Sequence, residues 1–208
     1  MKRFSIKNLG YILFILFSFF GFSESIAQKK QGFSAGISAG LVASQVDGDR
    51  YSGYQRLGMQ GGIFSSFTIG EDMFGKIEIK YMQKGSKRVD QKNGVYFELK
   101  LQYIEVPVLA GYQIDEKFSV EAGPGLGYLI KAEEDRDGAG FTEADPAFES
   151  YEICGILGLN YELNDNIIAN VKASYSMLPV RPHPGNQTYY MDKGNYNNLI
   201  CASVYYRF

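Results

Sequence analysis

The sequence has little of the chemistry on which most enzymes depend. Its 208 residues include one histidine, two cysteines and no tryptophan. His183 stands between Pro182 and Pro184, and no nucleophile, acid or base accompanies it at a recognisable catalytic spacing. The sequence therefore predicts no catalytic residues, no cofactor and no enzyme activity.

An excess of positive charge and long apolar runs are also missing from most of the chain. The formal net charge is −2, so the sequence predicts no binding of nucleic acid. After residue 28 no apolar stretch approaches the roughly 20 residues that a transmembrane helix needs. These absences leave a membrane β-barrel possible, because its alternating strands have a neutral average hydropathy.

The N-terminal segment has the three parts of a secretory signal peptide. Lys2, Arg3 and Lys7 are basic, residues 9–22 are apolar, and Ser25-Ile26-Ala27 places small residues at a cleavage site. The apolar part is about 14 residues, too short for a retained membrane anchor. We therefore expect residues 1–27 to be a cleaved signal peptide and residues 28–208 to be a single domain.

Alternation of apolar and polar residues recurs along the whole of that domain and predicts an all-β fold. In one segment Ile77, Ile79 and Tyr81 alternate with Lys76, Glu78 and Lys80. Eight strands are expected, around residues 32–42, 58–69, 76–81, 95–112, 118–131, 151–163, 167–178 and 200–208.

The expected strand 95–112 contains a break in its pattern. Phe97, Leu99 and Leu101 share one face, whereas the apolar series resumes out of phase from Ile104. If all these residues point outward, the strand needs a β-bulge near Tyr103.

The expected connections alternate in length. Residues 70–73, 113–116 and 164–166 form tight turns, whereas residues 43–57, 85–94, 132–150 and 179–195 form long loops. Short turns at one end and long loops at the other are typical of bacterial outer-membrane barrels. The sequence thus predicts an eight-stranded antiparallel up-and-down transmembrane β-barrel with four external loops, located in the cell outer membrane.

The two faces of the strands distinguish this fold from a soluble lipocalin-like barrel, which is the alternative. One face is apolar, with aromatic residues near the short turns at Phe67, Phe74, Tyr112, Phe118, Tyr161, Tyr206 and Phe208. The other face combines glycines and small polar residues with Lys76, Glu78, Lys80, Glu105, Glu121, Lys172 and Arg207. Since eight strands enclose a lumen just wide enough for side chains, we expect these charges to pair inside it.

Three other groups of residues invite functional interpretations. Glu105 and Glu121 could be a pair of catalytic acids, but neutralisation by lumen lysines is the simpler expectation. The acidic segments 133–137 and 47–49 lack the full spacing of a calcium loop, so no metal site is predicted. Cys154 and Cys201 should face the lumen as free thiols, because a strand separates them.

Several segments resemble the outer-membrane β-barrel family of Bacteroidetes often called PorT-like. These segments are residues 81–85 (YMQKG), 103–109 (YIEVPVL), 121–128 (EAGPGLGY) and 205–208 (YYRF). The resemblance implies an eight-stranded outer-membrane barrel and no single biochemical activity. Because some members resemble parts of gliding and secretion machinery, a role in such a complex is one alternative.

The last strand carries apolar residues at alternate positions up to a terminal aromatic residue. Phe208, Tyr206 and Val204 resemble the signal that the barrel assembly machinery reads, which makes this machinery an expected partner. Outer-membrane lipid and envelope proteins are the other expected partners. The function predicted is a non-enzymatic structural or interaction role in the cell envelope; a small lipid-modifying enzyme is a further alternative.

Overall fold

The computed structural model describes residues 32–49, 53–90, 95–182 and 194–208. The expected signal peptide, residues 1–27, and His183 lie outside these ranges. In the described ranges no helix is long and apolar enough to cross a membrane.

The described residues form a closed ring of eight antiparallel strands, as predicted. The ring strands are β1 (Phe33–Asp47), β2 (Arg56–Ile69), β3 (Met73–Asp90), β4 (Val95–Gln113), β5 (Phe118–Arg136), β7 (Tyr151–Glu162), β8 (Ile167–Ser176) and β10 (Gly194–Arg207). Each strand pairs with its neighbour along the chain, and β1 pairs with β10 to close the barrel. Two short strands, β6 (Thr142–Glu143) and β9 (Arg181–Pro182), pair with β5 and β10.

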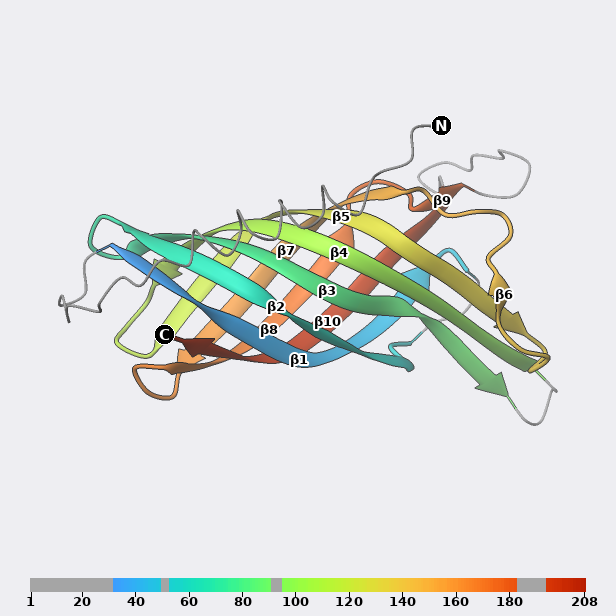
Figure 1. Cartoon of the computed structure of the whole chain (residues 1–208), viewed down its shortest axis with the longest axis horizontal. Helices are drawn as coiled ribbons and strands as arrows, with labels where there is room; N and C mark the ends of the chain where they lie inside the picture. The colour runs from blue at the N-terminus through green and yellow to red at the C-terminus, as the bar shows by residue number, and fades with distance from the viewer. Residues whose placement is uncertain (1–31, 50–52, 91–94, 183–193) are drawn as a thin grey trace, which may run out of the picture. The chain divides into compact units, whose positions relative to one another are not determined.

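Tight connections lie at one end of the barrel, together with the C-terminus (Figure 1). They span residues 70–72, 114–117 and 163–166. In the second of them, the N–H groups of Lys117 and Phe118 each donate to Asp115 Oδ1 at 2.8 Å. These hydrogen bonds favour the charged carboxylate and lower the pKa of Asp115.

The outside of the barrel is an apolar band between two girdles of aromatic residues. Near the tight turns the girdle contains Phe67, Tyr112, Phe118, Tyr161 and Tyr206, and at the other edge it contains Tyr54, Tyr128, Tyr151, Tyr175 and Tyr196. On β5, Phe118 and Tyr128 are ten residues apart, roughly 33 Å along the strand. A strand tilt of about 40° reduces this to roughly 25 Å, the height of a lipid-facing band.

Phe74 is an exception to the predicted girdle. It pairs with Gly111 on the lumen side, where a Cβ at Gly111 would collide with the Phe74 ring. Phe67, on the outside, covers Gly75 in the same manner. The strand alternation explains the difference, because Phe74 is in phase with the inward Lys76.

The predicted irregularity near Tyr103 is present, but its location and consequence differ from the prediction. The register between β4 and β5 shifts between Gln102 and Tyr103, so the extra residue is Ile130 in β5. Strand β4 keeps its alternation. Phe97, Leu99 and Leu101 therefore point into the barrel and are buried, and the prediction that they face outward is wrong.

The strands also extend further at the outer end than the sequence suggested. Residues 85–94 were expected to form a loop. Instead β3 continues to Asp90, which pairs with Val95 at the start of β4. The connection is reduced to residues 91–94. Strands β3, β4 and β5, the longest of the barrel, therefore continue beyond its apolar band (Figure 1).

Candidate functional site

A continuous network of charged side chains occupies the lumen at the level of the apolar band. Its members come from β3, β4, β5, β7 and β8, and each is at most 6% exposed. They are the lysines Lys76, Lys80, Lys84 and Lys172 and the glutamates Glu78, Glu105, Glu121 and Glu152. Equal numbers of the two signs make the network formally neutral, which suits groups removed from water.

The inner part of the network is centred on Lys172. Its Nζ lies 2.5 Å from Glu78 Oε1 and 3.2 Å from Glu121 Oε1, and it donates to Tyr205 Oη at 2.9 Å. Lys76 Nζ reaches Glu121 Oε2 at 2.5 Å. Glu121 thus contacts two lysines, and Glu78 contacts three, because Lys76 and Lys80 also lie within 4 Å of it.

The outer part of the network joins the inner part through Lys80. Its Nζ lies 3.5 Å from Glu78 Oε2 and 3.3 Å from Glu105 Oε1. Lys84 Nζ then contacts Glu105 at 2.6 Å and Glu152 at 2.9 Å. The chain of contacts crosses the lumen without interruption from Glu121 to Glu152.

The predicted pairing of lumen charges is confirmed for six of the seven residues named from the sequence. Glu105 and Glu121 bind lysines and are not in direct contact as a pair of acids. Arg207 differs, since it binds Glu162 at 2.9 Å near the tight turns. Lys84 and Glu152 were missed, although both are in phase with the inward residues of their strands.

Gly158 on β7 allows two network side chains to pass close to the backbone. A Cβ at this position would lie 2.9 Å from Glu121 Cγ and 3.0 Å from Lys172 Cγ. At Gly155, three residues away on the same strand, a Cβ would meet no atom within 4 Å. The absence of a side chain at Gly158 is therefore part of the network geometry.

Substituting valine at Gly158 should lower the free energy of unfolding by about 1–3 kcal/mol, because overpacking would displace the buried charges. Reversible urea unfolding in liposomes would measure the loss. Gly155→Val is the matched control on β7 and should be nearly neutral. Equal losses from both variants would contradict the close approach at Gly158.

Above the network, an apolar cluster fills the outer end of the lumen. It contains Val46, Phe97, Leu99, Leu101, Tyr103, Ala144, Phe148 and Val180, with Leu129 and Ala132 packed against it. Ala144 and Phe148 belong to the segment between β5 and β7 and cover the inward side chains of β4. The barrel interior is therefore filled by charged pairs below and by apolar side chains above.

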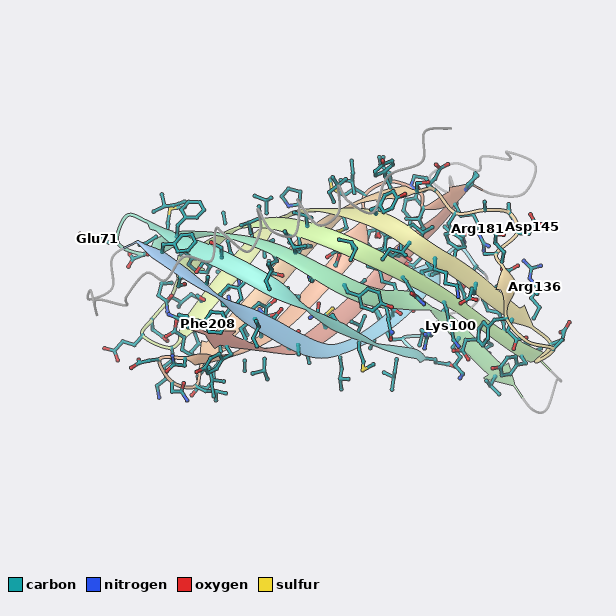
Figure 2. The ribbon with its side chains drawn as sticks, in the orientation of Figure 1. Glu71, Lys100, Arg136, Asp145, Arg181 and Phe208 are labelled. Carbon is teal, nitrogen blue, oxygen red and sulfur yellow. The ribbon has the colours of Figure 1, made fainter. Side chains whose placement is uncertain are left out.

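Arg181 holds this covering segment against the barrel wall. Its guanidinium lies 4.3 Å from the centre of the Phe148 ring and 3.5 Å from Glu134 Oε2, and it donates to Asn195 Oδ1 at 3.0 Å. Burial lowers the pKa of Arg181, and the Glu134 carboxylate opposes that shift. Figure 2 shows Arg181 with Arg136 and Asp145 at the outer end.

The other residues singled out in the sequence take part in the packing and the ion pairs of the barrel. Cys154 and Cys201 are buried, free and on the lumen side, with β8 between their strands. In the acidic segment, Glu134 binds Arg136 and Arg181. No group of three or more histidine, cysteine, aspartate or glutamate residues within the described ranges is arranged to hold a metal ion.

The C-terminal residues lie at the closing seam of the barrel. Val204 and Tyr206 face outward and pair with Ala39 and Ile37 of β1. The Phe208 N–H donates to Ala35 O at 3.0 Å, while the Phe208 side chain is 77% exposed and contacts the Tyr206 ring (Figure 2). An exposed terminal ring is accessible to an assembly factor, a role that stays a prediction.

Deletion of Phe208 should separate folding from insertion. The lost side chain is exposed, so refolding into detergent should persist, while the amount in the outer membrane of living cells should fall sharply. Heat-modifiable gel mobility of refolded protein and outer-membrane yield would measure the two effects. An unchanged membrane yield would show that the assembly machinery does not read Phe208.

Comparison with known proteins agrees with this architecture. The sequence profile described as "Outer membrane protein beta-barrel domain" matches residues 23–180. No curated protein sequence matches the chain. Among solved structures, Neisserial surface protein A is similar with a TM-score of 0.54 and 14% identity, over 86% of this chain and 100% of that one.

A second similar structure is Ail, the attachment invasion locus protein of Yersinia pestis, crystallised with the heparin analogue sucrose octasulfate. Its TM-score is 0.51 and its identity 16%, again over 86% of this chain and 100% of that one. At these identities, both structures support the fold alone.

Proposed function

Because the chain belongs to the outer-membrane protein β-barrel domain family, we propose that this outer-membrane protein has a non-enzymatic interaction role in the cell envelope. The observation that carries the proposal is that the lumen is filled, while β3, β4 and β5 extend beyond the apolar band and form an outer sheet. Network lysines and glutamates bind one another, and the apolar cluster covers them. These side chains are thus engaged in packing, and the outer sheet is the part that can meet a partner.

The filled lumen also argues against a role as an open channel. An eight-stranded barrel has room for its own side chains and little else. Lys172 and Glu105, 1% exposed each, occupy the path that water or solutes would need. Purified protein in planar bilayers should therefore give no steady ionic conductance, and open-channel currents above the lipid background would contradict a purely interactive role.

Photo-crosslinking in living cells would test the interaction itself. A photoreactive amino acid at Val89, 45% exposed near the outer end of β3, should form discrete adducts with an envelope protein. The control is the same amino acid at Ile79, 50% exposed in the apolar band, where we expect lipid adducts. Identical adduct patterns at both positions would contradict a partner at the outer end.

The resemblance to PorT-like proteins supports a second, narrower proposal, membership of a secretion or gliding complex. The residues of its most specific element occupy the lumen: Glu105 binds two lysines, and Tyr103 belongs to the apolar cluster, with Lys84 Nζ 4.9 Å from its ring centre. This element therefore has a structural explanation that is independent of any partner. Deleting the gene and measuring secreted protein would test the narrower proposal, and unchanged secretion would contradict it.

A further inference from the structure

We propose that Arg56, Lys87 and Lys100 form a binding site for a phosphate group of a lipid headgroup in the outer leaflet. The three side chains surround Glu98 on the part of the wall formed by β2, β3 and β4. Their height on the barrel, their charge and their exposure carry the proposal.

The height of the cluster corresponds to the headgroup layer. On β4, Tyr112 belongs to the girdle near the tight turns, and Gln102 lies ten residues further along the strand. This is the separation that spans the apolar band on β5. Lys100 and Glu98 follow two and four residues later, roughly 5–10 Å above the band.

Lys87, Lys100 and Glu98 also lie on the side of the sheet that faces lipid lower down, whereas Arg56 begins β2 in phase with the inward Gln60 and brings its guanidinium to Glu98. Lys100 and Glu98 alternate with the inward Leu99 and Leu101, and they are in phase with the outward Ile104. Lys87 is paired directly with Glu98 across β3 and β4. Lipids that surround the barrel can therefore place their headgroups against these side chains.

The charge of the cluster is unbalanced, unlike that of the lumen network. Lys87 Nζ lies 3.0 Å from Glu98, Arg56 Nη1 3.6 Å and Lys100 Nζ 3.9 Å, so one carboxylate faces three cations. Three further acidic residues share this face of the sheet, and one of them, Glu143 on β6, is paired directly with Glu133. Glu133 pairs with Lys131 at 2.9 Å, and Asp135 accepts a hydrogen bond from the Gly140 N–H at 3.2 Å.

Over the whole face these described charges balance, so the excess is local: three cations gather around the single buried carboxylate of Glu98. An anion with several oxygens would complete the coordination of the cations.

The cations remain accessible to a ligand. The side chains of Lys87 and Lys100 are 36% and 33% exposed, compared with at most 6% for the lumen lysines. Lys100 Nζ lies 3.4 Å from the centre of the Phe141 ring, which holds the ammonium group beside the sheet. Arg56 is less accessible, with 15% of its side chain exposed, and its Nη1 donates to Leu57 O at 2.7 Å, while its Nε is buried and has no hydrogen-bond partner among the described residues.

The favoured occupant is a phosphorylated glycolipid, and not a soluble polyanion. A soluble polymer would meet the outermost loops first, where the described segment 133–149 is rich in acidic residues that repel it. A membrane lipid approaches from the side, where Lys87 and Lys100 lie.

The test compares full-length protein in phosphatidylcholine nanodiscs that contain either bisphosphorylated lipid A or its dephosphorylated form. Lipid retained after purification is measured by native mass spectrometry. Wild type should prefer the phosphorylated lipid, and Lys87→Gln/Lys100→Gln should reduce that preference roughly tenfold or more. Glu98→Gln should keep or increase it, because the competing carboxylate is removed.

Lys117→Gln, in a tight turn at the opposite end, is the matched control and should behave as wild type. Heat-modifiable mobility of each variant verifies folding, and the single variants Lys87→Gln and Lys100→Gln provide the comparison if the double variant fails to fold. Equal retention by wild type and folded variants would overturn the proposal. So would loss of the bound lipid to inorganic phosphate or to a soluble sulfated sugar.

Discussion

Replacing Lys172 with methionine should lower the free energy of unfolding by about 3–5 kcal/mol, because it leaves buried carboxylates without their partner. Lys172 contacts both Glu78 and Glu121, and the three side chains are at most 1% exposed. Removal of the ammonium also takes away the hydrogen bond to Tyr205. Urea unfolding in liposomes, monitored by aromatic fluorescence, would measure the change.

Lys131→Met is the control for this prediction. Lys131 also forms an ion pair, with Glu133 at 2.9 Å, but its side chain is 55% exposed and the pair is screened by water. We expect a loss of about 0–1 kcal/mol. A second variant, Lys172→Met/Glu78→Gln, should recover part of the larger loss. If Lys172→Met were as mild as the control, the lumen would be open to water.

Replacing Ile79 with arginine should cost about 2–4 kcal/mol, because the charge would enter the hydrocarbon near the bilayer midplane. Ile79 is 50% exposed on β3 and pairs with the outward Ile63, well within the apolar band. The measurement is again reversible unfolding in liposomes of matched thickness.

The neighbouring Lys80→Arg is the control for Ile79→Arg. Lys80 is 3% exposed and lies between Glu78 and Glu105. An arginine at this position would keep a positive charge beside these two carboxylates. We expect this substitution to be much milder. Reversed costs would show that the inner and outer faces of the barrel have been exchanged.

The sequence predicted the strand number, their order and the two faces, because alternation with period two is a local property. The same alternation would have found Lys84 and Glu152, which continue the inward series of β3 and β7. Lys84 lies beyond residue 81, where the expected strand ended, whereas Glu152 lies inside the expected strand 151–163, whose apolar face alone was assigned. Which lysine contacts which glutamate could not be predicted, since those contacts depend on register across the lumen.

The error at Leu99 and Leu101 has a physical cause. Within the apolar band, apolar side chains point outward to lipid, as Ile104 does. Above the band the outer surface meets water and headgroups, so the usual preference returns and apolar side chains point inward. On β4 the polar and apolar faces therefore exchange at this height, while the backbone keeps its alternation. In the sequence this exchange looks like a bulge, but it marks the membrane boundary.

The seam between β1 and β10 has a consequence for the kinetics of folding. Its register runs from Gly36 with Arg207 to Asp47 with Tyr196, so it joins residues separated by most of the chain. Contacts between residues so far apart in the sequence form slowly, because closing the loop between them costs entropy before the contacts can stabilise the fold. Strand β1 therefore stays unpaired on one edge until β10 joins it. Until then the N–H and C=O groups along that edge of β1 can pair with a strand of another molecule, so a delay at the seam favours aggregation.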